Sequence, residues 1–100
     1  MQVQIRSRGI PLTAGSHARI ERQVRLAFGR LGGDGGPVSR VRLAVADAKG
    51  DVEPGDLAVS VLVSTGAFAV IQIDERAASL ERGVERALGR AVRAMERRLS

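Results

Sequence analysis

Three consecutive stretches of alternating apolar and polar residues lie between two stretches with helical periodicity, and this order constrains the fold more than any other feature. The central stretches run from about Val38 to Ala46, from Leu57 to Val63 and from about Ala67 to Ile73. Alternation with a period of two is typical of a strand with one buried face. The segments Asp47–Asp56 and Ser64–Gly66 favour hairpin turns, so the three strands are expected to form an antiparallel meander.

The N-terminal segment also alternates, since Val3 and Ile5 are separated by Gln4 and followed by Arg6. We expect this strand to add at an edge of the meander. Thr13 then has the character of a helix N-cap, because its hydroxyl can accept a hydrogen bond from a free amide of the first turn.

A first helix is predicted after Thr13, and it should end in the glycine-rich segment Gly32–Pro37. Its apolar residues share one stripe at helical spacing. The stripe consists of Ile20, Val24, Ala27, Phe28 and Leu31. A second helix is predicted from about Arg76 to Leu99, weakened by Gly83 and Gly89.

The predicted order is therefore β-α-β-β-β-α, an α+β fold, with residues 1–100 forming a single domain. Because each helix has one apolar stripe, both helices are expected to cover the same face of a four-stranded sheet in a two-layer sandwich. The core should draw on residues from all of these elements. It should include Ile20, Val24, Phe28, Val59, Val61, Val84, Ala91 and Met95.

The composition restricts the function. The formal net charge is +5, and fifteen of the sixteen basic residues are Arg, with Lys49 as the only Lys. Cysteine is absent, so thiolate metal sites and cysteine nucleophiles are excluded. The only aromatic residues are Phe28 and Phe68, which does not suit stacking on single-stranded RNA. No apolar stretch has the length of a membrane span, and we expect a cytoplasmic protein.

The second helix carries a row of arginines opposite its apolar stripe. Measured from Arg82, the others lie within about 80° around the helix axis. The row consists of Arg82, Arg86, Arg90, Arg93 and Arg97. A row of this kind is suited to phosphate contacts. The alternative is an ordinary solvated face, in which Arg82 pairs with Glu85 and Arg93 with Glu96.

Four further arginines are expected on the face of the sheet that the helices leave open. Arg6 and Arg8 belong to the first strand, and Arg40 and Arg42 to the second. They fit either contact with nucleic acid or protection of exposed strands against edge-to-edge pairing.

No catalytic constellation is recognisable in the sequence. His17 has no second His or Cys with which to bind a metal. The glycine cluster after Gly29 follows a helix instead of a strand and lacks the Gly-Lys-Ser/Thr of a phosphate loop. Asp74 and Glu75 are expected just before the last helix, where acids complement its dipole. The sequence predicts neither an enzyme, a cofactor nor a small-molecule substrate.

The order of elements and several residues resemble the ribosome hibernation-promoting factors, also called the ribosome-associated inhibitor or sigma-54 modulation family. The similarity lies in the opening Met-Gln-Val-Gln-Ile-Arg-Ser-Arg-Gly, in Leu12-Thr13, in the stripe of the first helix, and in the Leu-Glu-Arg that begins at Leu80. Because the chain ends at Ser100, it resembles the short form without the dimerisation domain.

Two features of the sequence depart from the family pattern. Arg76 stands where the family usually has a Tyr, and Arg22 and Arg25 lie one residue earlier than its basic pair in the first helix. The resemblance implies docking on the small ribosomal subunit, where the protein would occlude the tRNA and mRNA path. The expected rRNA-binding residues are Arg22, Arg25, Arg82, Arg86, Arg90, Arg93 and Arg97.

Two other functions fit the residues. One is a binder of double-stranded or otherwise structured RNA that acts away from ribosomes. The other is a protein-interaction module in which the arginines only reflect the composition. Failure to cosediment with ribosomes would favour the first, and absence of RNA binding at low salt would favour the second.

Overall fold

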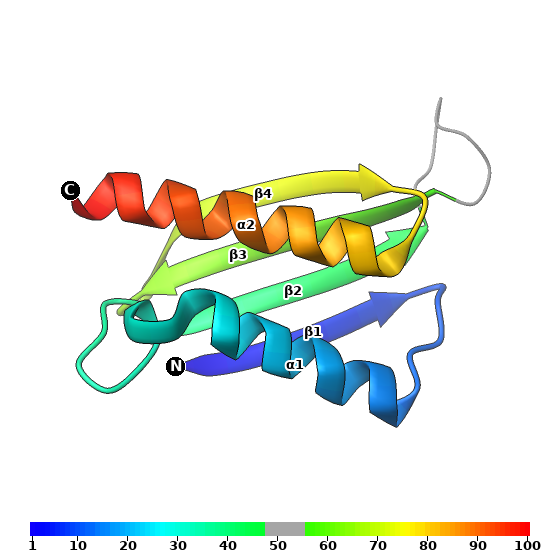
Figure 1. Cartoon of the computed structure of the whole chain (residues 1–100), viewed down its shortest axis with the longest axis horizontal. Coiled ribbons are helices and arrows are strands. Elements are labelled where there is room, and N and C mark those ends of the chain that lie inside the picture. Colours follow the sequence, from blue (N-terminus) through cyan, green and yellow to red (C-terminus); the bar gives the residue numbers. More distant parts are fainter. Residues whose placement is uncertain (48–55) are drawn as a thin grey trace.

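The computed structural model describes residues 1–47 and 56–100. The elements follow the predicted order (Figure 1). They are β1 (Gln2–Arg8), α1 (Ala14–Phe28), a short 3-10 helix η1 (Gly29–Leu31), β2 (Arg40–Asp47), β3 (Leu57–Thr65), β4 (Phe68–Ala77) and α2 (Leu80–Leu99).

The four strands form one mixed sheet in the order β1-β2-β3-β4. β2, β3 and β4 form the predicted antiparallel meander, and β1 adds beside β2 in the parallel direction. The pairing of β3 with β4 shifts register between Val63 and Ser64. The prediction that the first strand lies at an edge is confirmed.

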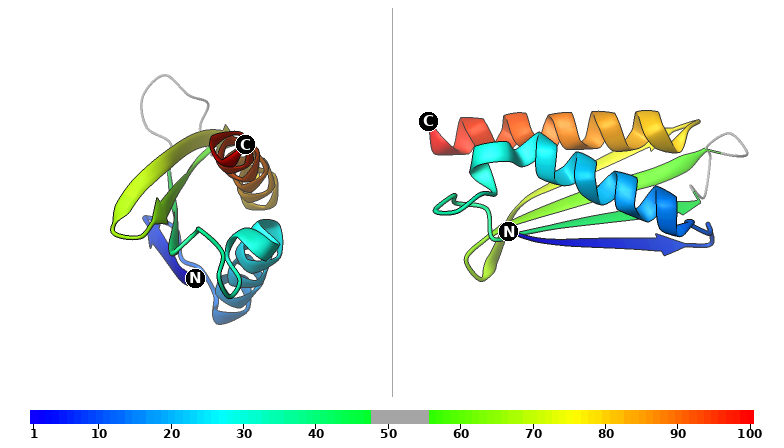
Figure 2. Two further views of the ribbon diagram at one scale, coloured as in Figure 1. Left: turned by 90° about the vertical axis from the view of Figure 1, so that its left-hand side faces the viewer. Right: turned by 60° about the horizontal axis from the view of Figure 1, so that its bottom comes forward.

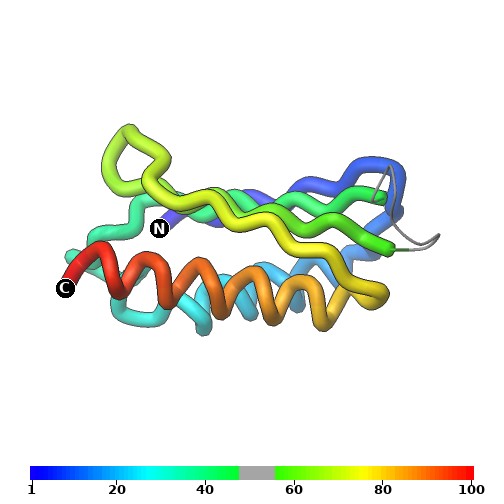
Figure 3. The backbone as a smooth tube through the Cα atoms, turned by 90° about the horizontal axis from the view of Figure 1, so that it is seen from above, coloured from blue at the N-terminus to red at the C-terminus, as the bar shows by residue number. Residues whose placement is uncertain are grey.

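Both helices cover the same face of the sheet, as predicted. Figure 2 shows α1 and α2 side by side over the strands, and Figure 3 shows them together on one side of the sheet. The core lies between the two layers. All eight predicted core residues are buried, and Phe28 is only 2% exposed. Alternate residues of β2 and β3, such as Val41, Leu43 and Val61, supply the sheet side of the core.

The N-termini of both long helices are capped by side chains. Thr13 Oγ1 accepts a hydrogen bond from the backbone N–H of Ser16 at 3.0 Å, which confirms the predicted cap. At the start of α2, Ser79 Oγ accepts from the N–H of Arg82 at 3.2 Å. Each cap satisfies an amide that has no partner within the helix.

The predicted start of the second helix at Arg76 is wrong. β4 extends beyond the expected Ala67–Ile73 and runs from Phe68 to Ala77, and α2 begins only at Leu80. Asp74 and Glu75 are therefore strand residues that pair with Ser60 and Val59, and they do not cap the helix dipole. The strand alternation is hidden in the sequence because the charged Glu75 takes a position on the core side of the sheet.

The second strand also begins later than predicted, at Arg40 instead of Val38. Val38 is nevertheless buried, and its N–H donates to the carbonyl of Leu31 at 2.8 Å. This bond ties the residue to the end of η1, so it does not join the sheet. Asp47, placed in the predicted hairpin loop, is the last residue of β2. Most of that loop, residues 48–55, lies outside the described residues.

Candidate RNA interface

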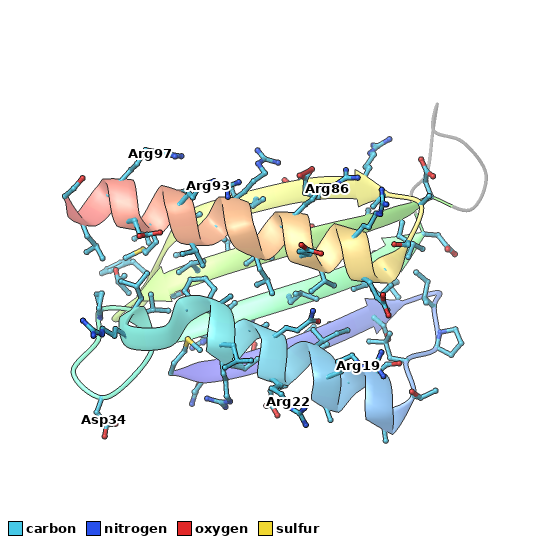
Figure 4. The ribbon with its side chains drawn as sticks, viewed as in Figure 1. Arg19, Arg22, Asp34, Arg86, Arg93 and Arg97 are labelled. Carbon is cyan, nitrogen blue, oxygen red and sulfur yellow. The ribbon has the colours of Figure 1, made fainter. Side chains whose placement is uncertain are left out.

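The row of arginines on α2 is exposed along its whole length. Its five members occupy the side of the helix opposite the buried stripe of Val84, Ala87, Ala91 and Met95. Figure 4 shows Arg86, Arg93 and Arg97 along the side of α2 that is turned away from α1. From Arg82 to Arg97 the row covers about 22 Å along the helix axis, at about 1.5 Å per residue. The predicted arrangement of the row is confirmed, and its role in binding stays a prediction.

Arg90 differs from the other members because it reaches the edge strand β4. Its Nη1 lies 3.4 Å from Oε2 of Glu75 and donates to the carbonyl oxygen of Asp74 at 3.1 Å. The Glu75 side chain is only 18% exposed, so the guanidinium balances a largely buried carboxylate. Arg90 therefore has a structural role in joining α2 to the sheet.

Glu81 and Glu85 of α2 lie on the side of the helix that faces α1. Glu81 forms an ion pair with Arg19 across the two helices, with 3.5 Å between Oε1 and Nη1. Neither Arg82–Glu85 nor Arg93–Glu96 is among the ion pairs of residues 1–47 and 56–100. The internal pairing that would make the row an ordinary solvated face is therefore not seen here.

A shallow groove separates α1 from α2 on the outer side of the helical layer. A hollow of about 370 Å³ lies between Gln23, Leu26 and Ala27 of α1 and Glu85, Leu88 and Gly89 of α2. Leu26 is 74% exposed there. The carboxylate of Glu85 disfavours a phosphate in this groove, so we place the candidate interface on the outer side of α2.

The two predicted arginines of α1 have different surroundings. Arg22 is exposed, and Figure 4 shows it on the side of α1 away from α2. Arg25 pairs with Glu21 at 3.8 Å, and its Nη1 donates to the carbonyl oxygen of Met1 at 3.3 Å. Because Arg25 points toward β1 and Arg90 toward β4, they lie at opposite edges of the sheet. The structure does not gather the seven predicted arginines into one patch.

Sequence reasoning missed the contact between Arg19 and Glu81. These residues are far apart in the chain, and only the side-by-side packing of α1 and α2 brings them together. Exposed Leu26 was also missed, because it lies outside the apolar stripe of α1. The one sequence signal for the exposure of Leu26 is that this large apolar residue lies outside the apolar stripe of the helix.

The remaining candidates for chemistry are dispersed. His17 is exposed in the first turn of α1, and Asp74 accepts hydrogen bonds from Ser60 and Gln72 on the open face of the sheet. Within the ranges that the structure covers, no group of three or more His, Cys, Asp or Glu side chains could hold a metal ion. None of the described helices combines the length and the hydropathy that crossing a bilayer requires.

Comparison with known proteins rests on structure alone. No protein-family profile matches the chain, and no curated protein matches its sequence. Two solved structures superpose over nearly the whole length. A ribosomal subunit interface protein from Coxiella burnetii is 10% identical, with a TM-score of 0.73, over 97% of this chain and 96% of the other.

The second structure is the N-terminal domain of Thermus thermophilus Protein Y. It is 14% identical, with a TM-score of 0.74, over 97% of this chain and 98% of the other. The chain has the Protein Y fold. The resemblance seen in the sequence is thus confirmed at the level of the fold.

Proposed function

We propose that this chain is a ribosome-associated factor that binds rRNA of the small subunit and inhibits translation by occlusion, without catalysing a reaction. One observation carries the proposal: an exposed row of arginines lies on α2, in a fold shared with a ribosomal subunit interface protein and with Protein Y. Such a role would be cytoplasmic.

The chemistry of the row suits a phosphate backbone. A guanidinium presents a planar fork of donors that matches phosphate oxygens, and it keeps its charge at any physiological pH. Arg82, Arg86, Arg93 and Arg97 are exposed and form no ion pair with another described residue. They are therefore available to phosphates, while Arg90 is held by Glu75 and Asp74.

The row would recognise shape more than sequence. The only aromatic side chains are Phe28, which is buried, and Phe68, which lies at the start of β4. Stacking on unpaired bases is therefore a poor fit for this surface. Arginines on a straight helix follow a phosphate backbone instead, and such contacts position a protein on structured RNA.

A titration of cell-free translation tests the proposal. Purified protein is added to a fixed concentration of ribosomes, and inhibition should be complete near one protein per ribosome because occupancy is stoichiometric. Raising the salt should relieve it, since phosphate contacts release counterions. Inhibition far below one protein per ribosome would indicate an enzymatic activity, and no inhibition at several-fold excess would contradict the proposal.

A further inference from the structure

The face of the sheet opposite the helices carries a second group of arginines. Figure 3 shows that the two helices lie on one side of the sheet, and within residues 1–47 and 56–100 no helix or strand covers its other side. Val41, Leu43 and Val45 of β2 point into the core. The alternate residues Arg40 and Arg42 therefore lie on the open face, because successive side chains of a strand point to opposite sides.

The parallel register of β1 places two more arginines on the same face. Val3 pairs with Val41 and Ile5 with Leu43, so the even-numbered residues of β1 share the open face with Arg40 and Arg42. Arg6 lies beside Ala44, and Arg8 lies beside Ala46. Arg40, Arg42, Arg6 and Arg8 thus form a diagonal band across β1 and β2, which we call the sheet band. It covers about 20 Å along the strands, at two-residue steps of about 6.6 Å.

Protection of an exposed sheet edge explains only two of the four arginines in the sheet band. β1 is an edge strand, so charges on Arg6 and Arg8 can discourage pairing with another sheet. β2 lies between β1 and β3 and has no free edge. Arg40 and Arg42 therefore protect no edge, although they add two charges to the same surface.

The local geometry favours an extended anion. Gln4 Oε1 accepts from Nε of Arg42 at 3.1 Å, which orients the guanidinium and leaves its two terminal nitrogens for another acceptor. The small side chains of Ala44 and Ala46 leave a hollow of about 440 Å³ beside Arg6 and Arg8. A phosphate could approach the strands closely there.

The other half of the open face differs in charge. Beside β3, strand β4 contributes Asp74, which Ser60 and Gln72 hold by hydrogen bonds, and also Arg76. One acid and one base leave that half neutral, so positive charge is concentrated on β1 and β2. We propose that the sheet band binds the phosphate backbone of a second RNA segment, so that the protein is held between two segments, one on each layer.

This inference rests on the proposed function for the identity of the ligand. The two surfaces are separate in the fold, because the α2 row lies on the side of α2 turned away from α1, near β4, and the sheet band lies on the open face over β1 and β2.

The test measures whether one protein brings two RNA duplexes together. One short RNA duplex carries a donor fluorophore, a second carries an acceptor, and energy transfer between them is followed as protein is added. The sheet variant is Arg6→Gln with Arg40→Gln, and the helix variant is Arg86→Gln with Arg93→Gln. The control is Arg30→Gln with Arg98→Gln, which removes the same charge from exposed residues outside both surfaces.

Wild type and the control should both bring the duplexes together, with strong energy transfer. The sheet variant should still bind one duplex through α2 but lose most of the energy transfer. Its log–log salt dependence should fall by up to about two units, one for each lost phosphate contact. The proposal for the sheet band would be overturned if the sheet variant showed the same energy transfer and the same salt slope as the control. Unchanged binding in the helix variant alone would instead contradict the α2 interface and leave the sheet band supported.

Discussion

Arg90 of α2 and Glu75 of β4 form an ion pair of 3.4 Å that fastens the last helix to the edge of the sheet. Glu75 is a charged residue at a position of β4 that faces the core, and its side chain is largely buried. The pair explains why one member of the arginine row is engaged within the protein while its neighbours point into solvent.

Loss of this pair should lower stability. Arg90→Ala leaves the carboxylate of Glu75 without its partner, and we expect the free energy of unfolding to fall by about 1 kcal/mol, near the upper end for a half-exposed pair. Arg86→Ala, four residues earlier on the same row, should change it by less than about 0.5 kcal/mol. Urea denaturation of both variants measures the difference. Equal stabilities would mean that the contact contributes nothing to the fold.

Most of the fold could be predicted because each strand and helix carries a clean apolar period. Val59, Val61 and Val63 alternate without interruption, and Ile20, Val24 and Phe28 fall on one helical stripe, so β3 and α1 were predicted correctly as elements. The predicted end of the first helix was too late, because α1 ends at Phe28 and Leu31 belongs to η1. The end of β4 was predicted wrongly, because Glu75 interrupts the apolar alternation. Its partner, Arg90, is fifteen residues away and becomes its neighbour only when α2 folds back over the sheet.

The candidate site was predictable only in part for the same reason. The α2 row depends on helical geometry alone, so the sequence places it correctly. The sheet band depends on the register between β1 and β2, which the sequence does not state. The neighbours that hold Arg25 and Arg90 also come from other elements, so no local pattern separates these two from the exposed arginines.

Substitution of the two glycines of α2 by alanine should change the stability of the protein in opposite directions. A Cβ at Gly83 would lie 2.8 Å from Cγ2 of Val59 and 3.4 Å from Cβ of Ala77, inside the tightly packed core. Gly83→Ala should therefore lower stability by about 1–2 kcal/mol, although alanine favours the helix.

At Gly89 the nearest atoms belong to the flexible end of Arg93, at 3.4 Å. Gly89→Ala should therefore raise stability by about 0.5–1 kcal/mol, because alanine has the higher helix propensity. Thermal unfolding of the Gly83→Ala and Gly89→Ala variants measures both changes in stability. A stabilising Gly83→Ala would show that α2 does not pack closely on β3.

Phe28 should be the most costly single truncation in α1. Its ring is buried in the core, and Phe28→Ala should lower the free energy of unfolding by about 3–5 kcal/mol through lost burial and the cavity left behind. Leu26→Ala, at an exposed position of the same helix, is the matched control and should stay within about 0.5 kcal/mol of wild type. A loss at Phe28 no larger than at Leu26 would mean that α1 is rotated about its axis.

The central claim is that the arginines of α2 bind rRNA of the small subunit. The most direct measurement is cosedimentation with purified small ribosomal subunits over a range of salt concentrations, for wild type, for Arg86→Gln with Arg93→Gln, and for the control Arg30→Gln with Arg98→Gln. We expect wild type and control to bind alike. The α2 variant should bind more weakly, with a salt slope reduced by about two units. Binding of the α2 variant equal to that of the control at every salt concentration would contradict the claim.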